Sequence, residues 1–98
     1  MEEMSQTFQR ALSLTDYQKK QAVRLYDEEI KNNPKNWAAV HNRGLCKLKL
    51  AIEEKNNDLL EESKIDFKKA ISVAKEVGVE EYPIAEANLK WAEETKFE

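Results

Sequence analysis

Apolar residues recur every three or four positions along most of this 98-residue chain, the spacing of helices that bury one face. This periodicity predicts five helices, at about 3–12, 16–32, 37–54, 58–77 and 83–96. No stretch shows the alternation of apolar and polar residues that is typical of a half-buried strand. The sequence therefore predicts an all-α fold.

Residues that favour helix ends support these limits. The segment 15–18, TDYQ, has the form of a capping box. Pro34 ends the second helix, and Asn36 suits the N-cap of the third. Gly78 suits the left-handed position after the fourth helix, and Pro83 suits the first turn of the fifth.

The apolar face of each helix predicts the core. The expected inward-facing residues are Met4, Phe8, Ala11 and Leu12; Ala22, Val23, Tyr26 and Ile30; Trp37, Val40, Gly44, Leu48 and Ala51, widened by Leu45 and Ile52; Leu60, Ser63, Phe67, Ala70, Ile71 and Ala74; and Ile84, Ala85, Leu89, Trp91 and Ala92. Cys46, the only cysteine, is expected to fill a helix contact.

Two helices share a short pattern of small and aromatic residues. Ala22-x-x-x-Tyr26 is followed by Pro34, and Ser63-x-x-x-Phe67-x-x-Ala70 repeats the small–aromatic spacing. This pattern resembles the second helix of a tetratricopeptide repeat (TPR), and helix 37–54, with its small Gly44, resembles the first helix. The resemblance implies one TPR-like domain over 1–98: a hairpin at about 3–33, a second hairpin at about 37–77 and a capping helix at about 83–96.

Three features depart from the TPR pattern. Glu29 occupies a position where the family has a small residue, and Lys47 stands where an aromatic residue is usual. The spacing from Gly44 to Ser63 is about seven residues longer than in the family, close to two helical turns. We therefore expect an elongated second hairpin, with one turn added to each helix.

Composition and charge bear on the partner rather than on the fold. The chain is 36% charged and 41% hydrophobic with only two glycines, which is typical of a folded helical protein. Its net charge is −3, yet Lys31 to Ile52 contains five basic and no acidic residues, which leaves −8 for the rest. This bias predicts an exposed basic face on helix 37–54.

The residues that usually carry catalysis are scarce. His41 and Cys46 are the only His and Cys, and a separation of five residues places them about 140° apart around a helix. We therefore expect no Cys–His nucleophile pair in this helix, no zinc site, no cofactor and no enzymatic activity. No apolar run approaches the roughly 18 residues of a membrane span. The N-terminus lacks the apolar region of a signal peptide, and these features predict a cytoplasmic protein.

The TPR resemblance implies a groove, lined by first helices, that binds a partner protein or peptide, and the basic segment favours an acidic one. The candidate partner-binding residues are Trp37, His41, Asn42, Arg43, Leu45, Lys47, Lys49 and Lys90. Among them, Trp37 and Leu45 are the expected apolar anchors. Asn42-Arg43 resembles the pair with which some TPR proteins clamp a C-terminal carboxylate, although Phe8 and Glu94 depart from that clamp.

Three other functions remain open at this point. One is self-assembly, with a homodimer formed through helix 83–96 and Trp91. Another is a small inhibitory, immunity-type protein whose acidic faces mask a basic enzyme. A third is nucleic-acid binding through Trp37 and its basic neighbours, which the acidic net charge of the whole chain disfavours.

Overall fold

The computed structural model describes residues 5–15 and 18–97, and within these ranges the chain forms five α-helices and no strand. The all-α prediction is therefore confirmed. The helices are α1 (Gln6–Leu14), α2 (Lys19–Asn32), α3 (Trp37–Glu54), α4 (Asn57–Glu76) and α5 (Pro83–Glu94). Met4 and the middle residues of the predicted capping box at 15–18 lie outside the described ranges.

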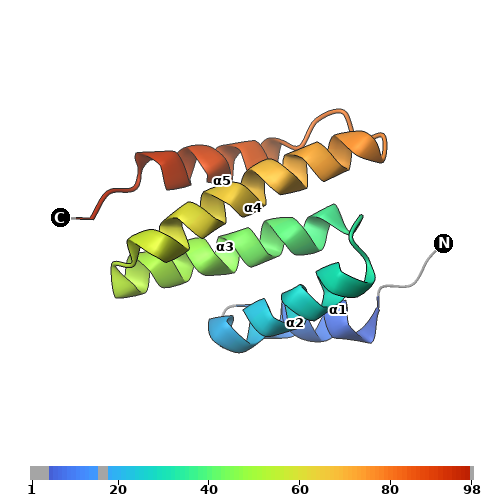
Figure 1. Ribbon diagram of the computed structural model, residues 1–98, viewed down its shortest axis with the longest axis horizontal. Helices are drawn as coiled ribbons and strands as arrows, with labels where there is room; N and C mark the ends of the chain where they lie inside the picture. Colours follow the sequence, from blue (N-terminus) through green and yellow to red (C-terminus); the bar gives the residue numbers. More distant parts are fainter. Residues whose placement is uncertain (1–4, 16–17, 98) are drawn as a thin grey trace.

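Helices that follow one another in the sequence also pack side by side (Figure 1). The contacts run from α1 to α2, α2 to α3, α3 to α4 and α4 to α5, and α5 also touches α3. The molecule measures 46 × 29 × 18 Å. Because a helix with its side chains is about 10 Å across, the shortest dimension holds at most two layers, so every helix reaches the surface.

The helix ends follow the predicted capping chemistry at Asn36, Gly78 and Pro83, and Asn56 adds a cap that was not predicted. The side chains of Asn36 and Asn56 accept hydrogen bonds from the backbone N–H groups of Ala39 and Leu59, which caps α3 and α4. Gly78 lies past the end of α4 with φ +93°, and Pro83 begins α5.

The core consists of two clusters that meet along α3. One joins α1 and α2 to α3 and includes Phe8, Tyr26 and Cys46; the other joins α4 and α5 to α3 and includes Phe67. The predicted burial of Cys46 is confirmed. Four residues that were expected in the core are exposed instead: Leu12, Ile52, Ile84 and Trp91.

Gly44 allows α3 and α4 to approach closely. A Cβ atom at this position would lie 2.9 Å from the Cβ of Asp66 and 3.1 Å from the Phe67 ring. Ser63 and Ala70, which were also predicted as small contact residues, are fully buried. Lys55 and Asn56 alone connect the two helices, so α3 and α4 form a long hairpin rather than two helices joined by a loop.

Candidate partner-binding site

Arg43 is held by carboxylates from two neighbouring helices. Its Nε and Nη2 donate to the two oxygens of Asp66 on α4, at 2.9 and 2.7 Å, and its Nη1 donates to Oδ1 of Asp27 on α2 at 2.9 Å. Burial opposes the charge, but the hydrogen bonds and charges of Asp66 and Asp27 raise the pKa of the guanidinium. Arg43 therefore links α2, α3 and α4.

Lys47 takes part in the same network. Its Nζ lies 3.2 Å from Oε1 of Glu62 and 3.7 Å from Oδ2 of Asp66. The side chains of Arg43 and Lys47 are only 15% and 14% exposed. The expectation of an exposed basic face is wrong for these two residues, because acidic residues of α2 and α4 fold against them.

His41 also faces inward. Its ring is buried between Phe67 and Tyr82, with ring centres 5.7 and 5.2 Å away, and its Nε2 lies 2.9 Å from Nδ2 of Asn88 on α5. Burial lowers the pKa of His41, and a hydrogen bond with Asn42 partly offsets this. His41 thus positions α5 on α3, whereas Cys46 belongs to the core cluster with α1 and α2 and approaches the backbone oxygen of Thr15.

The two expected apolar anchors are engaged in packing. The ring of Trp37 meets Tyr82 edge to face, with centres 4.8 Å apart, and burial raises the pKa of Tyr82 to about 12. Leu45 packs against the core cluster of α3, α4 and α5. Asn42 is partly buried, and Lys90 is exposed on α5.

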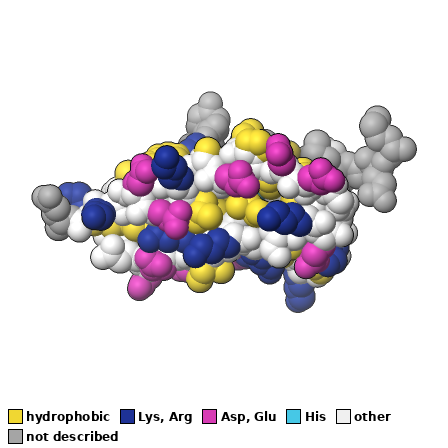
Figure 2. Space-filling model, turned by 90° about the horizontal axis from the view of Figure 1, so that it is seen from above, with side chains coloured by type: hydrophobic (Ala, Val, Ile, Leu, Met, Phe, Trp, Pro, Cys, Tyr) yellow, Lys and Arg dark blue, Asp and Glu magenta, His cyan; other side chains and the backbone are white. Residues whose placement is uncertain are grey.

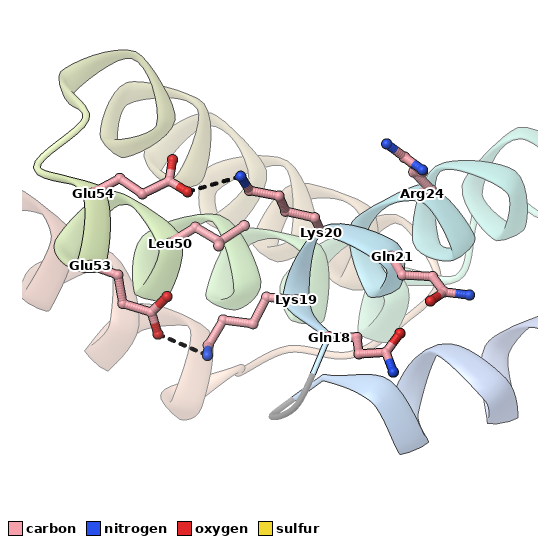
Figure 3. A pocket seen from close by; sticks show the side chains of 8 residues that line it. All are labelled: Gln18, Lys19, Lys20, Gln21, Arg24, Leu50, Glu53 and Glu54. Carbon is pink, nitrogen blue, oxygen red and sulfur yellow. Dashed lines mark ion pairs between the residues drawn. The ribbon is translucent and has the colours of Figure 1, made fainter.

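A surface hollow with a volume of about 450 Å³ lies between α2 and α3. Its wall is polar apart from Leu50 and consists of Gln18, Lys19, Lys20, Gln21, Arg24, Leu50, Glu53 and Glu54 (Figure 3). Two ion pairs cross it, Lys19–Glu53 at 2.8 Å and Lys20–Glu54 at 3.1 Å. These pairs fasten α2 to α3.

The second hollow, which we call the α3–α5 groove, has a volume of about 330 Å³. It is lined by Lys19, Lys49, Ile52, Glu53 and Trp91. Ile52 and Trp91 are 38% and 43% exposed, so two large apolar side chains from different helices stand open on one groove.

Of the residues predicted from the sequence to bind a partner, Lys49 alone lines this groove. Ile52 and Trp91 had both been assigned to the core, and Trp91 had also been linked to self-assembly. Adjacency to the buried Ala51 and Ala92 would not have revealed this, because adjacent residues such as Leu50 and Ala51 are both buried.

No family model, curated protein or solved structure matches the chain. Across the described ranges, no helix combines the length and apolar character needed to cross a membrane. Within the same ranges, no three His, Cys, Asp or Glu side chains are grouped so that they could hold a metal ion. Function is therefore inferred from the surface of this chain alone.

Proposed function

We propose that this protein is a cytoplasmic, TPR-like interaction module that binds a peptide or a partner helix in the α3–α5 groove and has no enzymatic activity of its own. One observation carries the proposal. Ile52 and Trp91 stand exposed on the same groove, with the basic side chain of Lys49 beside them.

Such a groove suits one apolar side chain of a partner. Tryptophan contributes strongly to protein interfaces because a single side chain removes a large apolar area from water. An apolar residue of the partner would pack between Ile52 and Trp91. Two lysines and one glutamate line the groove, and this charge favours a neighbouring acidic residue in the partner.

The TPR-like arrangement is supported by the packing of consecutive helices and by the small residues where they meet. Gly44 lies against α4, and Ala22 and Ala70 are fully buried in the contacts of α2 and α4. A carboxylate clamp is not supported, because Arg43, the basic member of the Asn42-Arg43 pair, already holds Asp66 and Asp27.

A peptide selection tests the groove directly. The Trp37→Phe variant leaves Trp91 as the only tryptophan, so Trp91 fluorescence reports binding at the groove. We expect a random peptide library to yield ligands that combine a large apolar residue with Asp or Glu, and these peptides should shift the Trp91 emission. Ile52→Asp should weaken binding by about tenfold or more, because it places a charge at the apolar contact.

Matched substitutions elsewhere serve as controls. Ile65 on α4 is 63% exposed and does not line the groove, so Ile65→Asp should leave peptide affinity unchanged. Lys49→Glu should weaken acidic peptides in a salt-dependent manner, whereas Lys69→Glu on α4 should not. If the Ile52 and Ile65 variants lost peptide affinity equally, or if the library yielded no enriched ligands, this groove would not be the binding site.

A further inference from the structure

His41, the one histidine of the chain, lies inside the fold where α5 meets α3. The residue is 5% exposed, and its ring lies between those of Phe67 on α4 and Tyr82, which directly precedes α5. On α5, Nδ2 of Asn88 lies 2.9 Å from Nε2 of the ring. Water therefore reaches this ring most readily when α5 and the residue before it move away.

The hydrogen bond to Asn88 requires a neutral ring. An amide NH2 group only donates, so Nε2 must accept, and the single proton of the ring is then on Nδ1. Protonation of Nε2 would place two donors face to face and a positive charge among aromatic side chains. Rotation of the Asn88 amide would remove the first cost but not the second. Burial accordingly lowers the pKa of His41.

The groups that face the ring carry no charge between pH 7.5 and 5.5. They come from all three helices and the α4–α5 connection: Asn42, Phe67, Tyr82 and Asn88. Burial raises the pKa of Tyr82 to about 12, so its hydroxyl stays neutral. On α4, Asp66 is held by Arg43, and on α5, Glu86 and Lys90 are exposed. The charge state of this contact therefore depends on His41.

Little apolar surface holds α5 in place. Its buried residues are the small Ala85 and Ala92, with Leu89 partly buried beside them. Seen from above, with α5 uppermost in Figure 1, hydrophobic side chains lie exposed between acidic and basic ones (Figure 2). Elements that bury few large side chains open at the lowest free energy, and an isolated helix of 12 residues is not stable in water.

We propose that His41 and Asn88 form a pH-sensitive latch, in which protonation of His41 in mild acid detaches α5 from α3 and α4. The detached state exposes the ring, which then binds a proton with its ordinary pKa of 6.5, whereas the docked state binds one only at lower pH. The docked state is thus favoured above about pH 6.5 and loses this advantage as the pH falls. Because Trp91 leaves Ile52 on detachment, the α3–α5 groove exists only in the docked state.

Amide hydrogen exchange of the full chain, followed by NMR and corrected for the intrinsic effect of pH, tests the latch. The amides of α5 should exchange faster than those of the α3–α4 hairpin, because α5 opens by itself. Between pH 7.5 and 5.5 the opening of α5 should increase severalfold and at most about tenfold, since an exposed imidazole with a pKa of 6.5 is about nine-tenths charged at pH 5.5.

Three variants assign this response to the latch. His41→Gln should make the opening of α5 independent of pH in this range. Asn88→Asp places a carboxylate at Nε2, which raises the pKa of docked His41 and should reverse the response, so that α5 is better protected at pH 5.5 than at pH 7.5. Ala87→Asp adds the same charge at an exposed neighbouring position and should respond to pH as the wild type does.

Three results would overturn the latch. The first is an α5 that opens only together with the α3–α4 hairpin. The second is a wild type that responds to pH no more than His41→Gln, and the third is an Asn88→Asp variant that still loses protection in acid.

Only the consequence for the groove rests on the proposed function. A peptide selected at pH 7.5 binds the docked state, so it should slow the exchange of α5 in proportion to its saturation. If the selection yields no peptide, the proposed function fails while the exchange of the free protein still tests the latch. If a peptide binds but the opening of α5 does not depend on His41, the latch alone is wrong.

Discussion

At the scale of single residues, the hydrogen bonds of a buried carboxylate explain one departure from the repeat pattern. Glu29 stands where a TPR has a small residue, and it is 3% exposed. Its Oε2 accepts hydrogen bonds from the amide groups of Asn33 at 3.0 Å and Asn36 at 2.9 Å, and its Oε1 accepts one from Ser5. Glu29 therefore organises the turn between α2 and α3, a role that a small side chain cannot have.

Because α3 and α4 lie so close at Gly44, the addition of one methyl group there should change the stability of the protein. Within a helix, replacing glycine by alanine stabilises the fold by about 1 kcal/mol where the added methyl group contacts no other atom. Here the new Cβ would lie 2.9 Å from that of Asp66, and we expect a net loss of about 1–2 kcal/mol in the free energy of unfolding. Urea unfolding measures this difference.

A graded series makes the test of Gly44 stricter. Gly44→Ser adds a larger side chain that is also a weaker helix former, so its loss should exceed that of Gly44→Ala. A Gly44→Ala variant that is more stable than the wild type would contradict the close contact.

At the scale of elements, the long α3–α4 hairpin depends on its short connection. Lys55 has φ +51°, in the left-handed region, and its N–H and that of Asn56 both bond to the carbonyl oxygen of Ala51. This is the hydrogen-bonding pattern of a helix C-terminus for which glycine is usually preferred.

Lys55→Gly should therefore stabilise the protein. Glycine adopts a positive φ without steric cost, and we expect a gain of about 0.5–1 kcal/mol after its greater entropy in the unfolded chain is included. Thermal and urea unfolding measure the gain. The same substitution at exposed Lys69, within α4, should instead cost about 1 kcal/mol. Destabilisation by Lys55→Gly would argue against the left-handed connection.

At the scale of the whole molecule, charges that are distant in the sequence offset one another. The basic segment around Arg43 and Lys47 meets Asp27, Glu62 and Asp66 from both neighbouring helices. Lys35 likewise pairs with Glu76 at the end of α4. The positive bias of one segment is therefore used to join helices rather than to form a broad basic surface.

The stability of the whole molecule in mild acid should depend on His41. Burial lowers the pKa of folded His41 below its ordinary value of 6.5, so below about pH 6.5 the unfolded chain binds more protons than the folded one. The stabilisation from neutral His41 is present above that pH and lost as the pH falls. The groups around the ring (Asn42, Phe67, Tyr82 and Asn88) carry no charge at this pH that would hold a proton on it.

His41→Gln removes this titration and keeps a polar side chain opposite Asn88. The wild type should lose more stability than the variant between pH 7.5 and 5.5, and the difference between their urea midpoints isolates His41 from the carboxylates common to both. If the urea midpoints of the two proteins changed in parallel with pH, His41 would not contribute to the loss of stability in acid.

Much of the fold follows from the sequence by itself. Helix periodicity, Pro34, Asn36, Gly78 and Pro83 determine where helices begin and end, because these effects act within a few residues. The pattern also identifies most core residues and the small side chain at Gly44, where α3 and α4 meet.

Tertiary structure alone decided which polar and apolar side chains stay accessible. Arg43 and His41 are enclosed by residues at least 16 positions away, as the distances to Asp27, Asp66 and Asn88 show. Ile52 and Trp91, 39 residues apart in the sequence, come together on one groove. Local spacing cannot reveal such relations, because charge pairing and exposure depend on which helices pack together. The packing of the helices encloses Arg43 and Lys47 and leaves Ile52 and Trp91 exposed on one groove.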